Sequence, residues 1–357
     1  MIEFPRLFEP QLQAPILLVA GNRSEALRLI PVLQQLRAAA AGSGALLVNA
    51  SPDAHSVNEC LRQCGLRADL CPGAGSTASG LSAFWQLWRL IGSIGPSLVV
   101  TGGSSVAAGR ALWAARLRGL ATVALMGAEQ DVLAPRARRR MRAATWRYLA
   151  AEHPGAARDR PRTLRVGDPL FDLCREQAAA VAAPAHEPGR RVLMYLPQAP
   201  WARVQRLCGE LSTAVRDLSD CRIDWLGDEA EPAASGEVEG SGSRIRLLGR
   251  LPHWRVLGLL RRADVVVTDS PVLAMEARWA GRPVLWASDQ PPPRGCIRCE
   301  GPQALAASLR HALLGHLAAT PLQEDGRAAA RLSAHLLSLT ADRSLAGLLS
   351  RRHLRWR

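Results

Sequence analysis

The stretch DVVVTDSPVLAMEARWAGRPVLW, residues 264–286, contains one complete strand–helix–strand unit. The β-branched run DVVVTDS predicts a buried strand, residues 273–280 predict a helix, and RPVLWAS predicts the next strand. A single helix between two strands implies that the strands are parallel and are joined by a right-handed crossover. The chain is therefore expected to contain an α/β domain with a parallel sheet.

Ser270 and Glu276 are the candidate functional residues of this unit, because they lie where the first strand gives way to the helix. Backbone N–H groups at a helix N-terminus can hold a diphosphate beside Ser270. Glu276 follows about one and a half turns into the helix, where its carboxylate could accept two hydrogen bonds from a ribose. Alternatively, Ser270 is an ordinary helix cap and Glu276 is solvated or salt-bridged. On this stretch alone the two interpretations are evenly matched.

A second strand–helix junction opens the chain, in LLVAGNRSEALRLIPVLQQLR, residues 17–37. The apolar strand breaks at Gly21 and a helix starts at once. Arg23, beside the helix N-terminus, is suited to contact an anion such as a phosphate. A plain cap, in which Asn22 or Ser24 accepts from backbone N–H groups, explains the same pattern.

Strands and helices alternate along the chain in two runs, and the first run includes a basic segment, RRRMRAATWRYLAAE, that predicts a helix. A Pro/Ala-rich linker near residues 178–190 follows, and the pattern restarts with RRVLMYLP. The expected fold is α/β, with two doubly wound, Rossmann-like parallel-sheet domains facing across a cleft. We place an N-terminal domain at residues 1–183 and a C-terminal nucleotide-binding domain at 184–335. A C-terminal helix or tail, residues 336–357, is expected to pack back on the first domain.

The composition of the 357 residues narrows the range of partners. Apolar residues make up 48% of the chain, the formal net charge is +14, and all 45 basic residues are arginine. A basic surface attracts anions such as nucleotides, nucleic acid or anionic lipid. No nucleic-acid-binding motif occurs, so nucleic acid is not expected as a partner.

The N-terminal residues and the cysteines bear on the cellular compartment. The apolar run PILLVA is too short for a signal peptide or a membrane span. Eight cysteines without an export signal indicate a reducing cytoplasm. Cys296 and Cys299 form a lone CxxC without the second pair that zinc sites usually need. We therefore expect a cytoplasmic protein with ordinary thiols and no metal.

Together these motifs resemble those of the non-hydrolysing UDP-N-acetylglucosamine 2-epimerases, which have the two-domain glycosyltransferase-B fold. The family's late motif, T-D-S-G-G-hydrophobic-Q-E-E-A, then Gly and P-V-L, matches at Thr268, Asp269, Ser270, Glu276, Ala277, Gly281 and residues 283–285. Its opening G-T-R-P-E-A-hydrophobic-K matches at Gly21, Arg23, Glu25 and Ala26, with Arg28 in the lysine position. VGDPLFD resembles the family's G-N-x-x-x-D through Gly167 and Asp172. The likeness covers most of residues 16–315, in the right order.

This resemblance implies a UDP-sugar or a related nucleotide as the ligand, implies no cofactor, and assigns roles by position. Arg23 would face the diphosphate or the sugar, and Arg28 would take the place of the family's lysine nearby. Ser270 would hold the diphosphate and Glu276 the ribose. Arg294, a remnant of the family's R-D-T-T-E-R-P-E loop, is a further candidate for substrate binding.

The acidic residues of the family's catalytic motifs are missing. The family's G-D-T becomes Gly102-Gly103-Ser104, and its H-V-E becomes Leu125-Met126-Gly127. Its P-E-E falls on Pro135-Arg136-Ala137, and its H-R-x-E-N becomes LPQAPW. Epimerisation requires removal of the C2 proton, which needs placed acids and bases. Glu129 lies two residues from the expected glutamate and on the same expected strand face, so it is the one catalytic candidate.

Three functions stay open on these residues. The first is a 2-epimerase-like, UDP-sugar-binding protein with degraded catalytic acids. The second is a glycosyltransferase of the same fold in polysaccharide or glycolipid synthesis, because stabilising a leaving diphosphate with arginines and helix N-termini needs fewer acids. The third is a non-catalytic nucleotide-sugar-binding protein that acts by contact with a partner.

Two further features carry open interpretations. The basic stretch APRARRRMRAATWRYL, residues 134–149, suits the surface of an anionic membrane, a nucleic acid or a solvated helix. His253 starts a helix where the family often has tyrosine. A catalytic role is one interpretation, and a position at the surface or as a cap is the one we expect. The sequence also leaves open whether the protein forms a homodimer.

Overall fold

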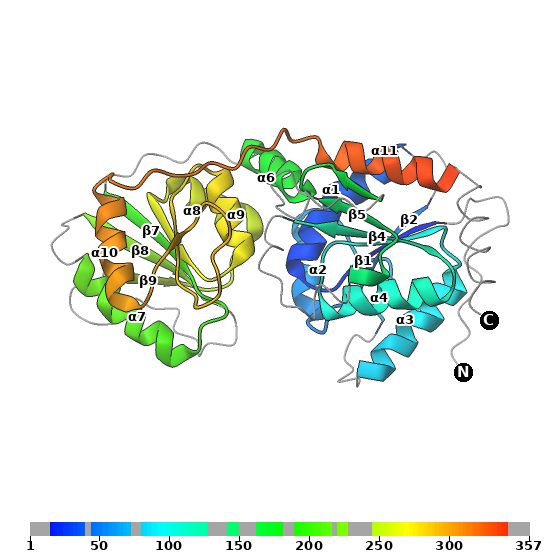
Figure 1. The fold of residues 1–357 in the computed structure, drawn as a ribbon, viewed down its shortest axis with the longest axis horizontal. Helices are drawn as coiled ribbons and strands as arrows, with labels where there is room; N and C mark the ends of the chain where they lie inside the picture. Colours follow the sequence, from blue (N-terminus) through cyan, green and yellow to red (C-terminus); the bar gives the residue numbers. More distant parts are fainter. Residues whose placement is uncertain are drawn as a thin grey trace. The chain divides into compact units, whose positions relative to one another are not determined.

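The computed structural model divides the chain into two compact units, Met1–Leu173 with Asp325–Arg357, and Cys174–Glu324 (Figure 1). It describes residues 15–39, 44–72, 80–127, 141–149, 162–180, 189–215, 220–227 and 245–341. These units differ from the predicted bounds, because the first boundary lies inside helix α6 (Pro169–Ala180) and not at residue 184. Most of the predicted linker lies outside the described residues.

The first unit is built on a six-stranded sheet in the order β2-β1-β3-β4-β5-β6, with every neighbouring pair parallel. The strands are β1 (Ile16–Ala20), β2 (Ala45–Asn49), β3 (Leu98–Thr101), β4 (Ala121–Met126), β5 (Trp146–Leu149) and β6 (Thr163–Arg165). All residues of β1 are buried, as expected for a central parallel strand covered by helices on both faces.

Helices cover this sheet, and one of them comes from the end of the chain (Figure 1). They are α1 (Arg23–Ala39), α2 (Ala54–Gln63), α3 (Gly80–Ile94), α4 (Val106–Leu117) and α11 (Ala328–Ala341), with a short 3-10 helix η2 (Met141–Ala143). Helix α11 packs on α1, where the Ser333 hydroxyl donates to the Val32 carbonyl. The last part of the chain that the structure describes therefore belongs to the first unit.

The described part of the basic segment RRRMRAATWRYLAAE does not form the helix that its sequence predicts. Its described part, residues 141–149, forms η2 and strand β5 instead. Strand β5 pairs with both β4 and β6, and Tyr148 in its middle is 1% exposed. Pairing on both edges and burial in the sheet outweigh the helix propensity of the Ala- and Arg-rich sequence.

The second unit has its own six-stranded parallel sheet, in the order β12-β11-β10-β7-β8-β9. The strands are β7 (Arg190–Tyr195), β8 (Cys221–Leu226), β9 (Ile245–Leu248), β10 (Val265–Thr268), β11 (Val284–Trp286) and β12 (Ile297–Arg298). Its helices are α7 (Trp201–Ala214), α8 (His253–Arg262), α9 (Pro271–Trp279) and α10 (Pro302–Leu313). The stretch 264–286 forms β10, α9 and β11, so the predicted parallel strand–helix–strand unit is confirmed.

Each sheet reverses its strand order at one place, which is where ligands bind in doubly wound folds. In the first unit the reversal falls between β1 and β3, and in the second between β7 and β10. Counted from β7, the second sheet has the strand order of dinucleotide-binding Rossmann folds. A ligand-binding site is therefore expected at the carboxyl ends of these four strands.

Candidate functional site

The reversal point of the first unit starts at the turn between β1 and α1. Asn22 Oδ1 accepts a hydrogen bond from the Glu25 backbone N–H at 2.9 Å, and the Ser24 hydroxyl donates to the same oxygen. Asn22 therefore caps α1, which is one of the two explanations that the sequence offers for this turn. Arg23 is the first residue of α1 and is partly exposed, and its contact with an anion stays a prediction.

Glu25 ties the β1–α1 turn to the start of α4. Its Oε2 accepts from the Gly21 N–H at 2.7 Å and from the Ser105 hydroxyl, and its Oε1 accepts from the Ser105 N–H at 2.8 Å. Burial raises the pKa of Glu25 above its usual range, although these hydrogen bonds oppose the rise. Both carboxylate oxygens are thus engaged within the protein.

Glu25 lies close against the backbone of Gly102 and Gly103. A Cβ on Gly102 would lie 2.5 Å from the Glu25 carbonyl oxygen, and one on Gly103 would lie 2.8 Å from the Glu25 side chain. The resemblance places a catalytic aspartate at position 103. An aspartate there would require Glu25 to move.

Arg28 makes a buried ion pair and is 1% exposed. Its Nε and one terminal nitrogen donate to the two oxygens of Asp168, at 2.7 and 3.0 Å, and its other terminal nitrogen donates to the Gly102 carbonyl at 2.7 Å. These bonds join α1, the end of β3 and the segment before α6. A substrate anion would have to compete with Asp168 for this guanidinium, and the predicted substrate contact of Arg28 stays a prediction.

In the second unit, the carboxyl ends of β7 and β10 are bonded to each other. The Thr268 hydroxyl donates to the Tyr195 carbonyl at 2.7 Å, and Asp269 accepts from the Gln198 N–H at 3.1 Å. Ser270 follows as the cap of α9, where its hydroxyl accepts from the Leu273 N–H at 3.4 Å. The N-terminus of α9 thus lies at the reversal point of the sheet, which suits an anion.

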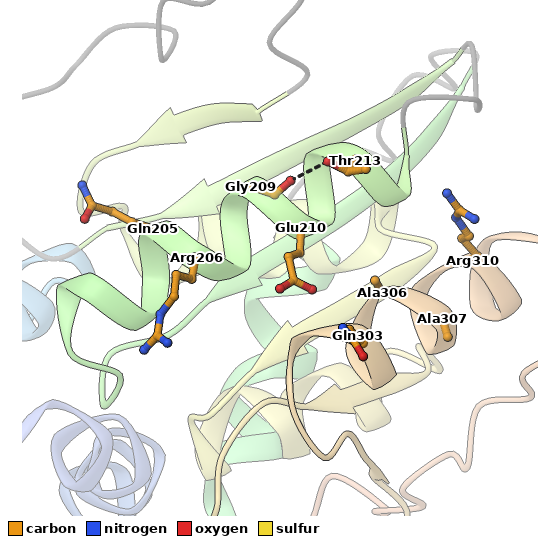
Figure 2. Close-up of a pocket in the computed structure, with 9 residues that line it drawn as sticks. All are labelled: Gln205, Arg206, Gly209, Glu210, Thr213, Gln303, Ala306, Ala307 and Arg310. Carbon is orange, nitrogen blue, oxygen red and sulfur yellow. Dashed lines mark hydrogen bonds between the residues drawn. The ribbon is translucent and has the colours of Figure 1, made fainter.

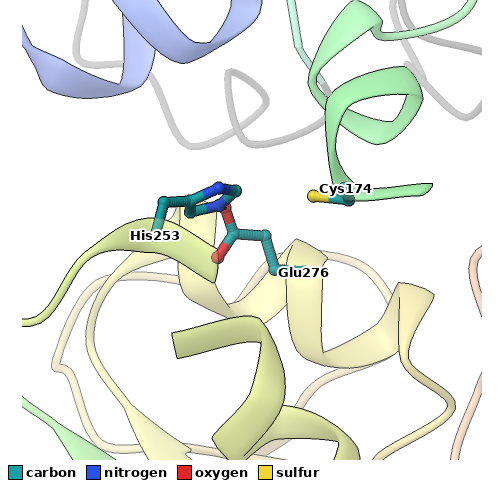
Figure 3. Close-up of side chains that lie close together, drawn as sticks. All are labelled: Cys174, His253 and Glu276. Carbon is teal, nitrogen blue, oxygen red and sulfur yellow. The ribbon is translucent and has the colours of Figure 1, made fainter. Parts of the chain in front are cut away.

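Glu276 lies inside α9, 3% exposed, and His253 holds it from the first turn of α8 (Figure 3). His253 Nε2 lies 2.9 Å from Glu276 Oε1, and its Nδ1 lies 2.7 Å from Gln177 Oε1. The imidazole is 5% exposed, so the predicted surface or cap position of His253 is wrong. Its position at the start of a helix gave no sign of this, because its two partners come from α6 and α9, far away in the sequence.

Cys174 lies close to His253 and Glu276 (Figure 3), and the three side chains are of types that can bind a metal ion. The thiol, imidazole and carboxylate atoms of this buried group lie within 4.8 Å of one another. The carboxylate and the imidazole are at hydrogen-bonding distance, and Gln177 holds the other ring nitrogen. In this arrangement the imidazole fixes the orientation of the carboxylate through its Oε1.

Two predicted site residues, Arg294 and Glu129, and the CxxC cysteines remain to be described. Arg294 is exposed in a turn before β12. Glu129, the catalytic candidate, lies outside the described residues. Among the CxxC cysteines, burial raises the pKa of the Cys296 thiol to about 12 and also raises that of Cys299. Both are therefore protonated thiols at neutral pH.

A groove of about 620 Å³ runs along the outer surfaces of α7 and α10 (Figure 2). Its lining includes Arg206 and Glu210 from α7, and Gln303 and Arg310 from α10. None of its lining residues belongs to the β7–β10 reversal point or to the predicted site. This groove is thus separate from the contacts around Glu276.

Asp269 supplies a prediction about pH. Burial raises its pKa from 3.8 to about 6. As pH rises from 3.8 to about 6, the unfolded chain gives up this proton while the folded chain keeps it, so the folded state loses stability. Above that range the difference is constant. The Asp269→Asn variant cannot ionise. As pH rises across this range, we expect its free energy of unfolding to increase relative to that of the native chain, and above about pH 6 we expect the difference between the two proteins to stay constant.

Urea unfolding of both proteins between about pH 4 and 7 measures this difference. Asparagine is the suitable substitute because its amide oxygen still accepts from the Gln198 N–H. A stability difference that stays flat between about pH 4 and 6 would contradict the raised pKa.

Two Rossmann-like units with parallel sheets, carried by one chain, define a glycosyltransferase-B-type fold. A UDP-GlcNAc 2-epimerase from Neisseria meningitidis, bound to UDP-GlcNAc, has this fold with a TM-score of 0.75 and 13% identity over 91% of this chain and 100% of that chain. The Methanocaldococcus jannaschii UDP-GlcNAc 2-epimerase, in complex with UDP-GlcNAc and UDP, matches with a TM-score of 0.72 and 14% identity over 91% and 99% of the two chains.

MurG from Acinetobacter baumannii is also similar, with a TM-score of 0.58 and 13% identity over 90% of this chain and 99% of that chain. No protein-family model matches the sequence, and no curated protein matches it. Identities this low establish the fold alone. The two-domain α/β fold that the sequence predicts is therefore confirmed, and the ligands named above belong to those proteins.

Proposed function

We propose that this protein is a divergent relative of the UDP-GlcNAc 2-epimerases that binds a UDP-sugar or a related nucleotide through its second unit but lacks epimerase chemistry. The observation that carries the proposal is the placement of Ser270 and Glu276 together on α9, which begins at the β7–β10 reversal point. The motif that resembles the family's nucleotide-binding segment thus lies where doubly wound folds bind nucleotides.

The contacts around α9 suit each part of a nucleoside diphosphate. At the N-terminus of α9, Pro271 has no N–H and the Leu273 N–H donates to the Ser270 hydroxyl, so the Val272 N–H and the positive end of the helix dipole are what favour a diphosphate beside Ser270. Deeper in the helix, His253 binds Oε1 of Glu276, and Oε2 would accept from the ribose hydroxyls. Arg23 and Arg294 remain predicted contacts to the diphosphate or the sugar. The expected cytoplasmic location remains part of this proposal.

The first unit supports the loss of epimerase chemistry. At the position of the family's G-D-T aspartate stands Gly103, and Glu25 fills the space that an aspartate would need. Glu25 itself has both oxygens bound to Gly21 and Ser105. It is therefore poorly placed to replace the missing acids as a base.

A second candidate is a glycosyltransferase of the same fold. Its support is the retained nucleotide motif together with the missing acids, since transfer from a nucleotide sugar depends more on stabilising the leaving diphosphate. The fold likeness extends to MurG. A non-catalytic nucleotide-sugar-binding protein fits the same residues, and turnover with added acceptors distinguishes these two.

Calorimetric titration with UDP tests the proposal through Glu276. We expect Glu276→Ala to lower the affinity for UDP roughly tenfold to a hundredfold, because a hydrogen bond to a charged group contributes about 1.5–3 kcal/mol. Glu276→Gln keeps an acceptor for His253 and removes the charge, so it should also weaken binding while preserving the local structure.

The matched control is Glu300→Ala, which removes an exposed carboxylate from the same unit. This variant should bind UDP with unchanged affinity. An unchanged affinity in both Glu276 variants would show that the ribose contact is assigned wrongly. No binding of UDP by the native protein would overturn the proposed function itself.

A further inference from the structure

Helices α3 and α4 of the first unit expose large apolar side chains at helical spacing. The exposed residues of α3 are Leu81 (75%) and Trp85 (55%), and those of α4 are Val106 (49%), Trp113 (42%) and Leu117 (56%). Leu81 and Trp85 are four residues apart, as are Trp113 and Leu117, so each pair lies on one side of its helix. Five exposed apolar side chains on two helices are more than the scattered apolar residues of an ordinary surface.

These two stripes face the same side of the unit because both helices cover the same face of the sheet. One core contains Leu87 and Ile91 of α3, Ala111 and Ala114 of α4, and strand residues Leu17, Val19 and Val99. The two helices lie side by side (Figure 1), and the Arg118 guanidinium, just after α4, lies 4.3 Å from the centre of the Trp88 ring of α3. The exposed side chains of both helices therefore form one surface, called here the α3–α4 surface.

The charge of this surface has one sign. No acidic residue occurs between Asp69 and Glu129 in the sequence. The two helices and the turn after α4 carry the arginines Arg89, Arg110, Arg116 and Arg118, of which three are exposed and Arg110 is half-buried. Tryptophan, leucine and arginine without any acid are the side chains that favour the boundary between lipid headgroups and acyl chains.

We propose that the α3–α4 surface docks on an anionic lipid bilayer. The apolar side chains, led by Trp85 and Trp113, enter the headgroup boundary, and the arginines contact lipid phosphates. Two modest attractions, apolar insertion and charge, together give stable but reversible attachment. Among the described residues, no helix has the length and apolar content to cross a bilayer.

A second copy of the chain fits this surface less well. A two-fold contact between identical surfaces would set the arginines of one copy against the same arginines of the other, with no acid on either surface. Anionic lipid supplies the complementary charge instead. Residues 134–140 lie outside the described residues, so the membrane contact predicted for residues 134–149 stays a separate prediction.

Vesicle co-sedimentation of the full chain tests the proposal. We expect binding to vesicles of phosphatidylcholine mixed with phosphatidylglycerol, little binding to phosphatidylcholine alone, and weaker binding at higher salt. The double variant Trp85→Ser/Trp113→Ser should reduce binding at least about tenfold, because two apolar anchors are lost. The control Trp254→Ser removes a tryptophan that is 38% exposed on α8 of the second unit, with Arg255 beside it, and should bind like the native chain.

A second variant, Arg89→Gln/Arg116→Gln, should weaken binding to the anionic vesicles and reduce its dependence on salt. All substituted side chains are exposed, so circular dichroism should report unchanged folding for each variant. The proposal is overturned if the native chain ignores anionic vesicles or if the double tryptophan variant binds as well as the native chain. It is equally overturned if sedimentation velocity shows a dimer that this variant dissociates, since the surface would then join two copies.

Discussion

Purified protein incubated with UDP-GlcNAc should form no manno epimer at enzymatic rates. Removing the weakly acidic C2 proton requires a placed base, and one acid–base group typically contributes about 10²–10⁴-fold to the rate. Gly103, Gly127 and Ala137 stand where the resemblance places acids, and none of them has a titratable side chain. Losing several such groups should remove most of the rate, although their contributions do not add. Chromatography of the two UDP-sugars measures the conversion.

A working 2-epimerase assayed beside this protein provides the positive control. Interconversion at ordinary enzymatic rates, about 1–10³ per second, would contradict the prediction. Glu129 would then be the first residue to replace, because it is the one acid that the sequence places near the missing glutamate. Glu25 would be the second, and its replacement should also disturb the turn at Gly21.

The Arg28→Met variant should unfold more easily than the native chain by about 3–5 kcal/mol, because it leaves the buried Asp168 carboxylate without its partner. Asp168 is 2% exposed and receives two of the guanidinium's hydrogen bonds. The Gly102 carbonyl loses a donor as well. Urea unfolding at neutral pH measures the difference in the free energy of unfolding.

Arg37→Met is the matched control, because Arg37 is 38% exposed and pairs with Asp69 on the surface. Exposed ion pairs contribute about 0–1 kcal/mol, so this variant should change stability by no more than that. If Arg28→Met instead left stability intact and abolished binding of UDP, Arg28 would be the substrate contact that its sequence position suggests.

The two sheets could be predicted because parallel strands leave a strong local pattern. The run VVV of β10 and the run LLVA of β1 are apolar throughout, and a helix follows each of these strands. Ser270 could be found for the same reason, since a cap residue directly follows its strand. Local spacing alone determines both features.

The features that the sequence misses depend on contacts between distant residues. Strand β5 has an Ala- and Arg-rich surrounding that favours a helix, and only its pairing with β4 and β6 makes it a strand. His253 is buried because Glu276 and Gln177 meet it from other helices. The boundary between the two units at Cys174 lies inside helix α6. The second half of α6 bonds to α8, where Gln177 contacts His253 and the Ala178 carbonyl accepts from Arg261.

Saturation-transfer NMR with UDP-GlcNAc in heavy water tests most directly whether the chain binds a UDP-sugar without epimerising it. We expect strong saturation of the uridine and ribose protons, weakened in Glu276→Gln, while the signal of the C2 proton keeps its intensity over hours. Retention of that signal means that solvent deuterium does not replace the proton. Absence of saturation at the uridine, or loss of the C2 signal at a rate proportional to the protein concentration, would contradict this function.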